Sequence, residues 1–198
     1  VQLGSAIDGE AAEDNSGYSV SINSDGTIVA IGAIANDGNG EYAGHVRAYE
    51  YSDGDWVQLG SDIDGEAAVD WSGRSVSLSS DGTIVAIGAT GNDGNGNNAG
   101  HVRVYEYSVD DWVQLGSDID GEAANDNSGT SVSLSSDGTI VAIGAIENDG
   151  NGEDAGHVRA YEYSDGDWVQ LGSDIDGEAA GDHSGRSVSL SSDGNIVA

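Results

Sequence analysis

Apolar and polar residues alternate along one short stretch of the chain, which then gives way to a β-branched run. In the sequence V-S-L-S at residues 76–79 the apolar side chains take every second position, which is the period of a half-buried strand. Residues 83–87 form a second strand candidate, rich in β-branched side chains. Asp81-Gly82 between them is a strong hairpin signal, because glycine adopts positive φ without steric cost. The pattern predicts two antiparallel strands joined by a tight turn.

This hairpin pattern recurs every 56 residues. Its Asp-Gly turn begins at Asp25, Asp81, Asp137 and Asp193. Self-similarity at a fixed period is typical of repeat architectures, in which each unit packs on its neighbours. We expect one array of three complete repeats, at residues 1–56, 57–112 and 113–168, and a partial fourth at 169–198. Because the sequence begins and ends inside a repeat, we expect a processed chain or a window on a longer array.

Each complete repeat has room for four short strands and shows no helical period. In the second repeat the strand candidates are residues 57–61, 73–79, 83–89 and 101–107. Four antiparallel strands in a repeat of this size are typical of a propeller blade. The predicted fold is therefore all-β, with β-propeller-type blades of four antiparallel strands and about three and a half repeats. A β-sandwich is the alternative, which repetition of one meander disfavours.

The motifs S-G-R-S-V-S-L-S-S-D-G-T-I-V-A-I-G-A at 72–89 and A-G-H-V-R-V-Y-E-Y at 99–107 resemble the FG-GAP repeat of integrin-α-type propellers. They are also similar to tandem repeats of secreted bacterial and algal surface proteins. The resemblance implies a propeller fold and an extracellular or cell-surface location. The Phe-Gly of the family is Ser72-Gly73 here, and its Gly-Ala-Pro is Gly88-Ala89-Thr90. The loop at 79–82 is too short to wrap an ion, so the family's calcium site is not carried over to it.

The charge of the chain restricts its partners. The sequence has 36 acidic residues against 5 arginines, for a formal net charge of −31. Nucleic acids and anionic membranes require clustered cations, so both are excluded as expected partners. Cations and neutral ligands such as glycans are favoured. Cysteine is absent, which excludes disulfides and thiolate metal sites, and no apolar run is long enough to insert into a membrane.

An acidic loop in each repeat is the first candidate for chemistry. Its carboxylates offer the hard oxygen ligands that calcium prefers. The predicted calcium ligands are Asp62, Asp64, Glu66 and Asp70, with their equivalents Asp118, Asp120, Glu122 and Asp126, and Asp174, Asp176, Glu178 and Asp182. Ala6 weakens the first copy of the loop. The alternative is a plain turn, whose aspartates accept hydrogen bonds from their own backbone.

A Gly/Asn-rich loop and one tryptophan are candidates for ligand binding. Candidate residues are Trp71 together with Asn92, Asp93, Asn95 and Asn97. Asn and Asp side chains suit an ion or a sugar hydroxyl, and an exposed indole suits a sugar ring. The alternative is a solvated loop of residues that tolerate positive φ.

Histidine and arginine recur with the repeat, at His101 and Arg103 and their equivalents, so we expect each to pair with a carboxylate in its own blade. The recurring tryptophans, such as Trp112, are expected to pack. Asp182-His183-Ser184 is not a catalytic triad, because adjacent residues cannot face one another as a triad requires.

Near-identical repeats without a unique polar cluster favour a non-enzymatic protein, since an enzyme requires one asymmetric site. We therefore expect an extracellular structural or adhesive repeat protein, a component of a surface scaffold or fibre. The alternative is a multivalent glycan-binding propeller with one weak site in each blade. Three blades are too few to close a ring. Further copies of the repeat, from a longer chain or from other molecules, are therefore the expected partners.

Overall fold

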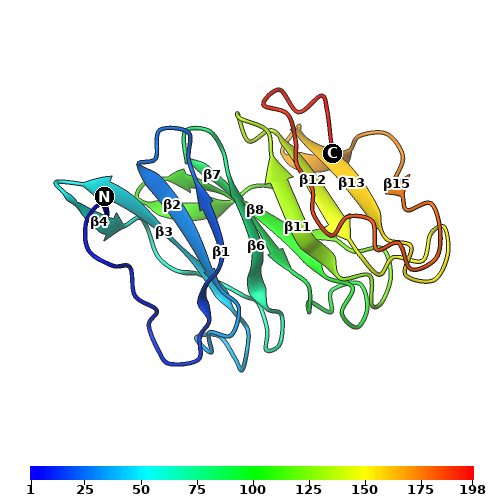
Figure 1. The fold of residues 1–198 in the computed structure, drawn as a ribbon, viewed down its shortest axis with the longest axis horizontal. Coiled ribbons are helices and arrows are strands. Elements are labelled where there is room, and N and C mark those ends of the chain that lie inside the picture. Colours follow the sequence, from blue (N-terminus) through cyan, green and yellow to red (C-terminus); the bar gives the residue numbers. More distant parts are fainter.

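Fifteen strands form three successive sheets in the computed structural model, which describes residues 1–198 (Figure 1). The first sheet comprises β1 (Ser16–Ile22), β2 (Ile28–Ala33), β3 (His45–Ser52), β4 (Asp55–Gln58) and β5 (Ile63–Asp64). The second comprises β6 (Ser72–Leu78), β7 (Ile84–Ala89), β8 (His101–Ser108), β9 (Asp111–Gln114) and β10 (Ile119–Asp120). The third comprises β11 (Ser128–Leu134), β12 (Ile140–Ala145), β13 (His157–Ser164), β14 (Asp167–Gln170) and β15 (Ile175–Asp176). No helix of the structure is long and apolar enough to cross a membrane.

Each sheet is an antiparallel meander of four strands with a short fifth strand added. In the first sheet the order is β1-β2-β3-β4, and β5 pairs with the free part of β3. The predicted hairpin is confirmed, since β6 pairs antiparallel with β7 and Gly82 in the turn has a φ of +79°. The fifth strand comes from the acidic loop that follows each outer strand. The loop therefore begins on one blade before the chain enters the next.

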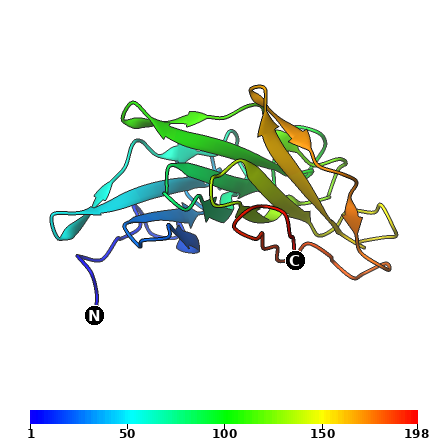
Figure 2. The same cartoon turned by 90° about the horizontal axis from the view of Figure 1, so that it is seen from above.

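The sheets follow one another as tandem blades, in chain order from blue to orange (Figures 1 and 2). Two apolar clusters lie between neighbouring sheets. One joins Val102 and Val104 of β8 to Leu134 and Val141 of the third sheet, and the other joins Val46 of β3 to Val85 of β7. Val20 at the end of the array is 64% exposed, whereas its equivalent Val132 is 9% exposed beneath a neighbouring blade. Face-to-face packing of blades is therefore what buries the core.

The serine positions of the alternating strand connect one blade to the next. Ser75 of β6 donates its hydroxyl to the Gly129 carbonyl of the third sheet at 2.7 Å, and Ser77 accepts from the Leu134 amide at 3.0 Å. A Cβ on Gly88 would clash with the Gly129 carbonyl and with the Ser75 hydroxyl. Glycine and serine in the inner strands thus permit a close approach of two backbones.

The predicted packing role of the recurring tryptophans is confirmed at the outer edge. Trp112 packs against the core between the first two blades and donates its indole N–H to the Leu59 carbonyl at 2.8 Å. Asp111 beside it accepts from the Ser61 amide at 2.9 Å. The segment that follows each outer strand is therefore bonded to the outer strand of the next blade.

The two ends of the chain differ from the expected strands. Residues 1–5 form no strand, and they are attached to β4 through hydrogen bonds from the Ser5 amide to Asp55 and from Trp56 to the Leu3 carbonyl. In residues 185–198 the expected fourth hairpin is reduced to one bridge, between Leu190 and Val197. The corresponding residues of the complete blades pair with more neighbouring strands than either of these end segments does.

Replacement of Gly88 by alanine tests the close approach of the blades. We expect Gly88→Ala to lower the free energy of unfolding by at least about 2 kcal/mol, because both atoms in the way belong to a packed interface. Gly54→Ala is the control, since nothing lies within 4 Å of a Cβ there and only its φ of +93° opposes the change. Urea denaturation of both variants measures the difference. An equal loss in the two would contradict the proposed packing constraint.

The turn aspartates predict a specific response to acid. Asp137 accepts hydrogen bonds from Ser135 and Thr139, which lower its pKa below the usual 3.8. A carboxylate with a lowered pKa stabilises the fold above its unfolded pKa, and the effect disappears as the pH falls through the folded value. Asp137→Asn should therefore cost up to about 1 kcal/mol at pH 7, and this cost should shrink as the pH is lowered from 7 toward 2.

Urea melts across this pH range compare Asp137→Asn with Asp165→Asn, an exposed aspartate of the β13–β14 turn. The Asp165 variant should match the parent protein at every pH. A cost for Asp137→Asn that persists unchanged at pH 2 would show that the charge of Asp137 does not stabilise the turn.

Candidate ligand-binding pocket

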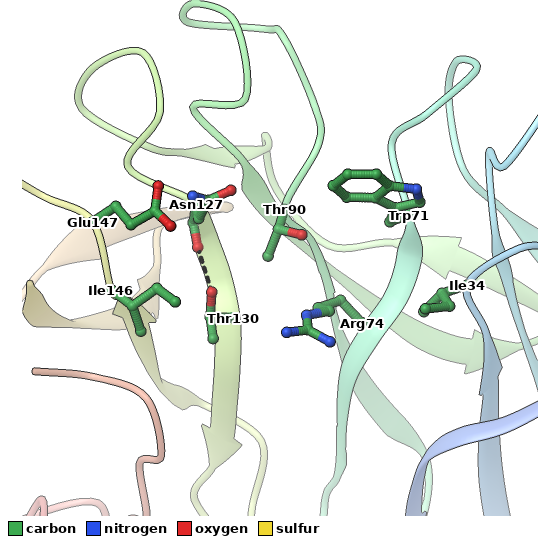
Figure 3. Close-up of a pocket in the computed structure, with 8 residues that line it drawn as sticks. All are labelled: Ile34, Trp71, Arg74, Thr90, Asn127, Thr130, Ile146 and Glu147. Carbon is green, nitrogen blue, oxygen red and sulfur yellow. Dashed lines mark hydrogen bonds between the residues drawn. The ribbon is translucent and has the colours of Figure 1, made fainter. Parts of the chain in front are cut away.

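A pocket of about 320 Å³ opens at one end of the inner strands (Figure 3). Eight residues from three blades line it: Ile34, Trp71, Arg74, Thr90, Asn127, Thr130, Ile146 and Glu147. Its volume is at the lower end of the range for small-molecule sites. The lining combines an indole, two isoleucines, a guanidinium, a carboxylate, two hydroxyls and an amide, so it offers apolar surface and hydrogen-bonding groups together.

Two kinds of segment carry these side chains. Trp71 and Asn127 stand immediately before β6 and β11, and Arg74 and Thr130 lie within those strands. The isoleucines, Thr90 and Glu147 follow the ends of β2, β7 and β12. Strand β6 contacts β1 of the first blade and β11 of the third. The pocket therefore forms where the ends of adjacent inner strands meet.

The pocket is lined by positions at which the repeats differ. The repeats differ at 14 of the 56 positions and are identical at the others. All eight lining residues occupy four of these variable positions, those of Asn15, Tyr18, Ile34 and Ala35 in the first repeat. Trp71, for example, is Asn15, Asn127 and His183 in the other repeats. The pocket is therefore asymmetric, although the other ten variable positions lie elsewhere in the repeats.

Trp71 has an unusual backbone conformation. Its φ is +54°, in the left-handed region that bulky side chains avoid. The equivalent Asn15 and Asn127 have φ of +57° and +53°, and asparagine tolerates this conformation far better. The indole is 37% exposed at the mouth of the pocket. The exposed ring in the pocket makes Trp71 a candidate for ligand binding.

Arg74 provides the pocket with an uncompensated positive charge. Its guanidinium lies 5.0 Å from the centre of the Tyr18 ring and forms no ion pair within 4 Å. Burial lowers the pKa of Arg74, and the positive charge of Arg186 adds to this effect. Figure 3 shows the guanidinium directed toward Thr130, whose hydroxyl donates to the Asn127 carbonyl at 2.8 Å. The guanidinium donors therefore remain available to a ligand.

The Asn-rich loop predicted as a ligand site lies outside this pocket. Asn92 is buried and donates to Asp70 at 3.2 Å, and Asn95 donates to the carbonyls of Gly121 and Glu122 in the next acidic loop. Asp93 accepts from the Asn98 amide at 2.8 Å, and Asn97 is exposed. These side chains hold the loop against its neighbours, and of the predicted ligand-binding residues only Trp71 lines the pocket.

The structure divides each predicted calcium set between two places. Asp62 lies beside Glu10 and His45, whereas Glu66 lies beside His101 and Asp118 of the next repeat. The second set is divided in the same way, with Asp118 beside Glu66 and His101, and Glu122 beside Asp174 and His157. In the third set only Asp174 belongs to such a cluster.

The last aspartate of the loop is occupied by its own backbone. Asp70 is 3% exposed and accepts from the amides of Glu66 and Ala67. Its equivalents Asp126 and Asp182 accept from the Ala123 and Ala179 amides. This is the arrangement of a plain turn, and calcium binding by the loop stays a prediction.

The middle aspartate of the loop continues the short fifth strand. Asp64 and Asp120 end β5 and β10, and Asp176 ends β15. Burial raises the pKa of Asp64 and of Asp120 above the usual 3.8. The Asp64 and Asp120 carbonyls accept from the guanidinium groups of Arg103 and Arg159 at 2.6 and 2.7 Å. The loop thereby connects each blade to an arginine of the next.

The expected ion pairs of the recurring arginines are present. Arg103 lies 3.6 Å from Glu66, and Arg47 lies 3.8 Å from Glu10. Sequence reasoning identified these groups from their recurrence, but it missed Arg74, Thr130 and Glu147 in the pocket. The signal that would have found them is the set of positions at which the repeats disagree.

Comparison with known proteins supports this architecture. A model of the FG-GAP repeat family matches residues 62–105 and 119–161. No curated protein matches the sequence. Among solved structures, hydrazine synthase of Kuenenia stuttgartiensis is similar, with a TM-score of 0.54 and 13% identity over 96% of this chain and 43% of that one. A putative TolB from Agrobacterium tumefaciens gives a TM-score of 0.51 and 13% identity over 90% of this chain and 51% of that one.

This chain spans about half the length, or less, of these solved proteins. At such low identity the likeness concerns the fold alone, and it agrees with the tandem blades described above. The family match covers the hairpin and the following strand in two successive repeats. Residues 62–105 and 119–161 are therefore FG-GAP-like repeats, and the chain folds as tandem β-propeller-type blades.

Proposed function

We propose that this chain is a non-enzymatic adhesive element of an extracellular repeat protein, and that it binds a sugar residue of a glycan in the pocket beside Trp71. The observation that carries the proposal is the coincidence of the pocket with the variable positions of the repeats. Packing between blades restricts most positions to one residue type. A pocket whose lining residues all stand at variable positions favours selection for a ligand rather than for stability.

The lining suits a sugar ring. An exposed indole such as that of Trp71 offers a flat apolar face for the C–H groups of a pyranose. Arg74, Thr90 and Asn127 offer donors and acceptors for ring hydroxyls. The free guanidinium also suits the carboxylate of an acidic sugar. Adhesion would then depend on one pocket shared by three blades, rather than on one weak site in each blade.

The composition of the pocket favours binding over hydrolysis. Glycoside hydrolysis requires, in most families, two carboxyl groups that flank the scissile bond. Glu147 is the single carboxylate of the lining. The recurring histidines lie in other places, since none of the eight lining residues is a histidine. These features support a non-enzymatic role, although one similar fold belongs to an enzyme.

An extracellular array would also supply the neighbours that the outermost blade faces require. Val20 and Ile22 of β1 are 64% and 60% exposed, whereas Leu78, the equivalent of Ile22, is 8% exposed. Exposed apolar strands of this kind favour association. Further copies of the repeat, from a longer chain or from other molecules, are the partners that we propose for this face.

A glycan array of the fluorescently labelled chain, followed by calorimetry with the best ligand, tests the proposal. We expect binding to one class of sugar, and Trp71→Asn should weaken it by at least about tenfold, a loss of roughly 1.4 kcal/mol. Asparagine is the natural residue at this position in the first and third repeats, so the variant should be at least as stable as the parent.

Asn97→Ala is the matched control, because Asn97 is exposed on the Asn-rich loop outside the pocket. It should bind as tightly as the parent. Loss of binding in the Asn97 variant, with full binding retained in Trp71→Asn, would place the ligand on the loop instead. An array without any bound glycan, or release of a cleaved sugar, would contradict the proposed function.

A further inference from the structure

Three equivalent clusters of one histidine and two carboxylates lie apart from the pocket. Each combines the first residue of a long strand with carboxylates from two successive acidic loops. The clusters are Glu10, His45 and Asp62; Glu66, His101 and Asp118; and Glu122, His157 and Asp174. In each, one nitrogen and two oxygen atoms lie within 4.8 Å of one another.

The imidazole in the middle cluster is buried without a hydrogen-bond partner. His101 is 1% exposed, and neither of its ring nitrogens has a partner. Its Nδ1 lies 3.9 Å from Glu66 Oε2 and 3.7 Å from Asp118 Oδ2. An N–H that donated to a carboxylate would lie about 2.7–2.9 Å from the oxygen. The observed spacing is therefore too long for a hydrogen bond, and it recurs at His45 and His157 with 3.8–4.0 Å.

Buried polar side-chain atoms in folded proteins almost always have a hydrogen-bond partner, so two unpartnered nitrogens on a buried imidazole call for an explanation. A neutral imidazole that turns its Nδ1 lone pair toward two carboxylate oxygens would be repelled by them. A cation between the three atoms converts this repulsion into attraction.

Neighbouring side chains hold both carboxylates in place for such a cation. Gln114 donates to Asp118 Oδ1 at 2.6 Å, which leaves Oδ2 directed toward the imidazole. Arg103 lies 3.6 Å from Glu66 Oε1, while Oε2 faces the imidazole and also accepts from Asn92 at 3.5 Å. Groups that orient metal ligands through their second oxygen are a common feature of metal sites.

We propose that each of these three clusters binds one divalent transition-metal cation, represented by Zn²⁺, through the histidine Nδ1 and one oxygen of each carboxylate. Zn²⁺ binds imidazole nitrogen and carboxylate oxygen at about 2.0–2.2 Å, which places tetrahedral ligands roughly 3.3 Å apart. Small movements of the two partly exposed carboxylates would shorten the distances from Nδ1 to their oxygen atoms to this value. Calcium takes oxygen ligands, so the buried imidazole favours a transition metal.

The metal would join successive acidic loops. Glu66 leaves the first blade after β5, whereas His101 and Asp118 belong to the second blade at β8 and just before β10. A bound ion therefore ties the connection between two blades to the next blade along the chain. It also neutralises part of the negative charge that accumulates there.

Metal titration of the untagged full chain after EDTA treatment tests the proposal. We expect native mass spectrometry and calorimetry to give three equivalents of Zn²⁺, with Co²⁺ producing visible absorption bands of a bound ion. His101→Gln and, separately, Glu66→Gln should each reduce three equivalents to two. Glu66→Gln is the milder substitution, because the Glu66 side chain is 44% exposed and this variant is expected to fold.

Two variants serve as controls. His183→Asn removes the one histidine outside the clusters and installs the residue found at Asn15 and Asn127, and Glu106→Gln removes an exposed carboxylate of β8. Both should retain three equivalents, with circular dichroism reporting the fold of every variant. Failure to bind Zn²⁺, an unchanged stoichiometry in folded Glu66→Gln, or binding of Ca²⁺ that His101→Gln leaves intact would overturn the proposal.

Discussion

The close approach of each blade's inner strands to the backbone of the next blade is the constraint on which the rest of the structure depends. At Gly88 the neighbouring Gly129 carbonyl occupies the space that a side chain would need, and the Ser75 hydroxyl bonds the same carbonyl. Two further contacts join neighbouring blades. They are the apolar clusters between the sheets and, at the outer edge, the hydrogen bond from the Trp112 indole to the Leu59 carbonyl. A repeat that meets identical neighbours must therefore present the same residues at each of these positions.

This constraint explains where the sequence is free to vary. The lining positions of the pocket lie outside the apolar clusters between the blades, and different repeats place an indole, a guanidinium, a hydroxyl or an amide there. The array in this way combines a repetitive scaffold with one asymmetric site. The acidic loops, in contrast, hardly vary after Ala6, because their aspartates hold turns, contact arginines and face the buried histidines. Carboxylates thus gather where blades join, and the side chains of the proposed binding pocket lie where strands end.

Much of the fold followed from periodicity. The Ser/apolar alternation, the Asp81-Gly82 turn and the 56-residue spacing predicted the hairpins and the tandem blades, because these features depend on neighbours in sequence. The sites were harder to predict, since they depend on contacts between repeats. Asp62 and Glu66 are close in sequence but face different histidines. Trp71 and Asn127 are 56 residues apart, and only the packing of successive blades brings them to one pocket. Residues 1–5 form no strand, because the partner that β3 provides for the equivalent residues 57–58 has no counterpart within residues 1–198.

The central claim is that the four variable positions that line the pocket form a binding site. Amide chemical-shift mapping by NMR, with the sugar selected on the glycan array added to labelled protein, tests it most directly. The account predicts that the largest shifts occur at Trp71, Arg74, Thr130 and their pocket neighbours, and that the Asn-rich loop at 92–98 and the open face of β1 show none. Shifts of equal size at equivalent positions in every blade, away from the pocket, would contradict it.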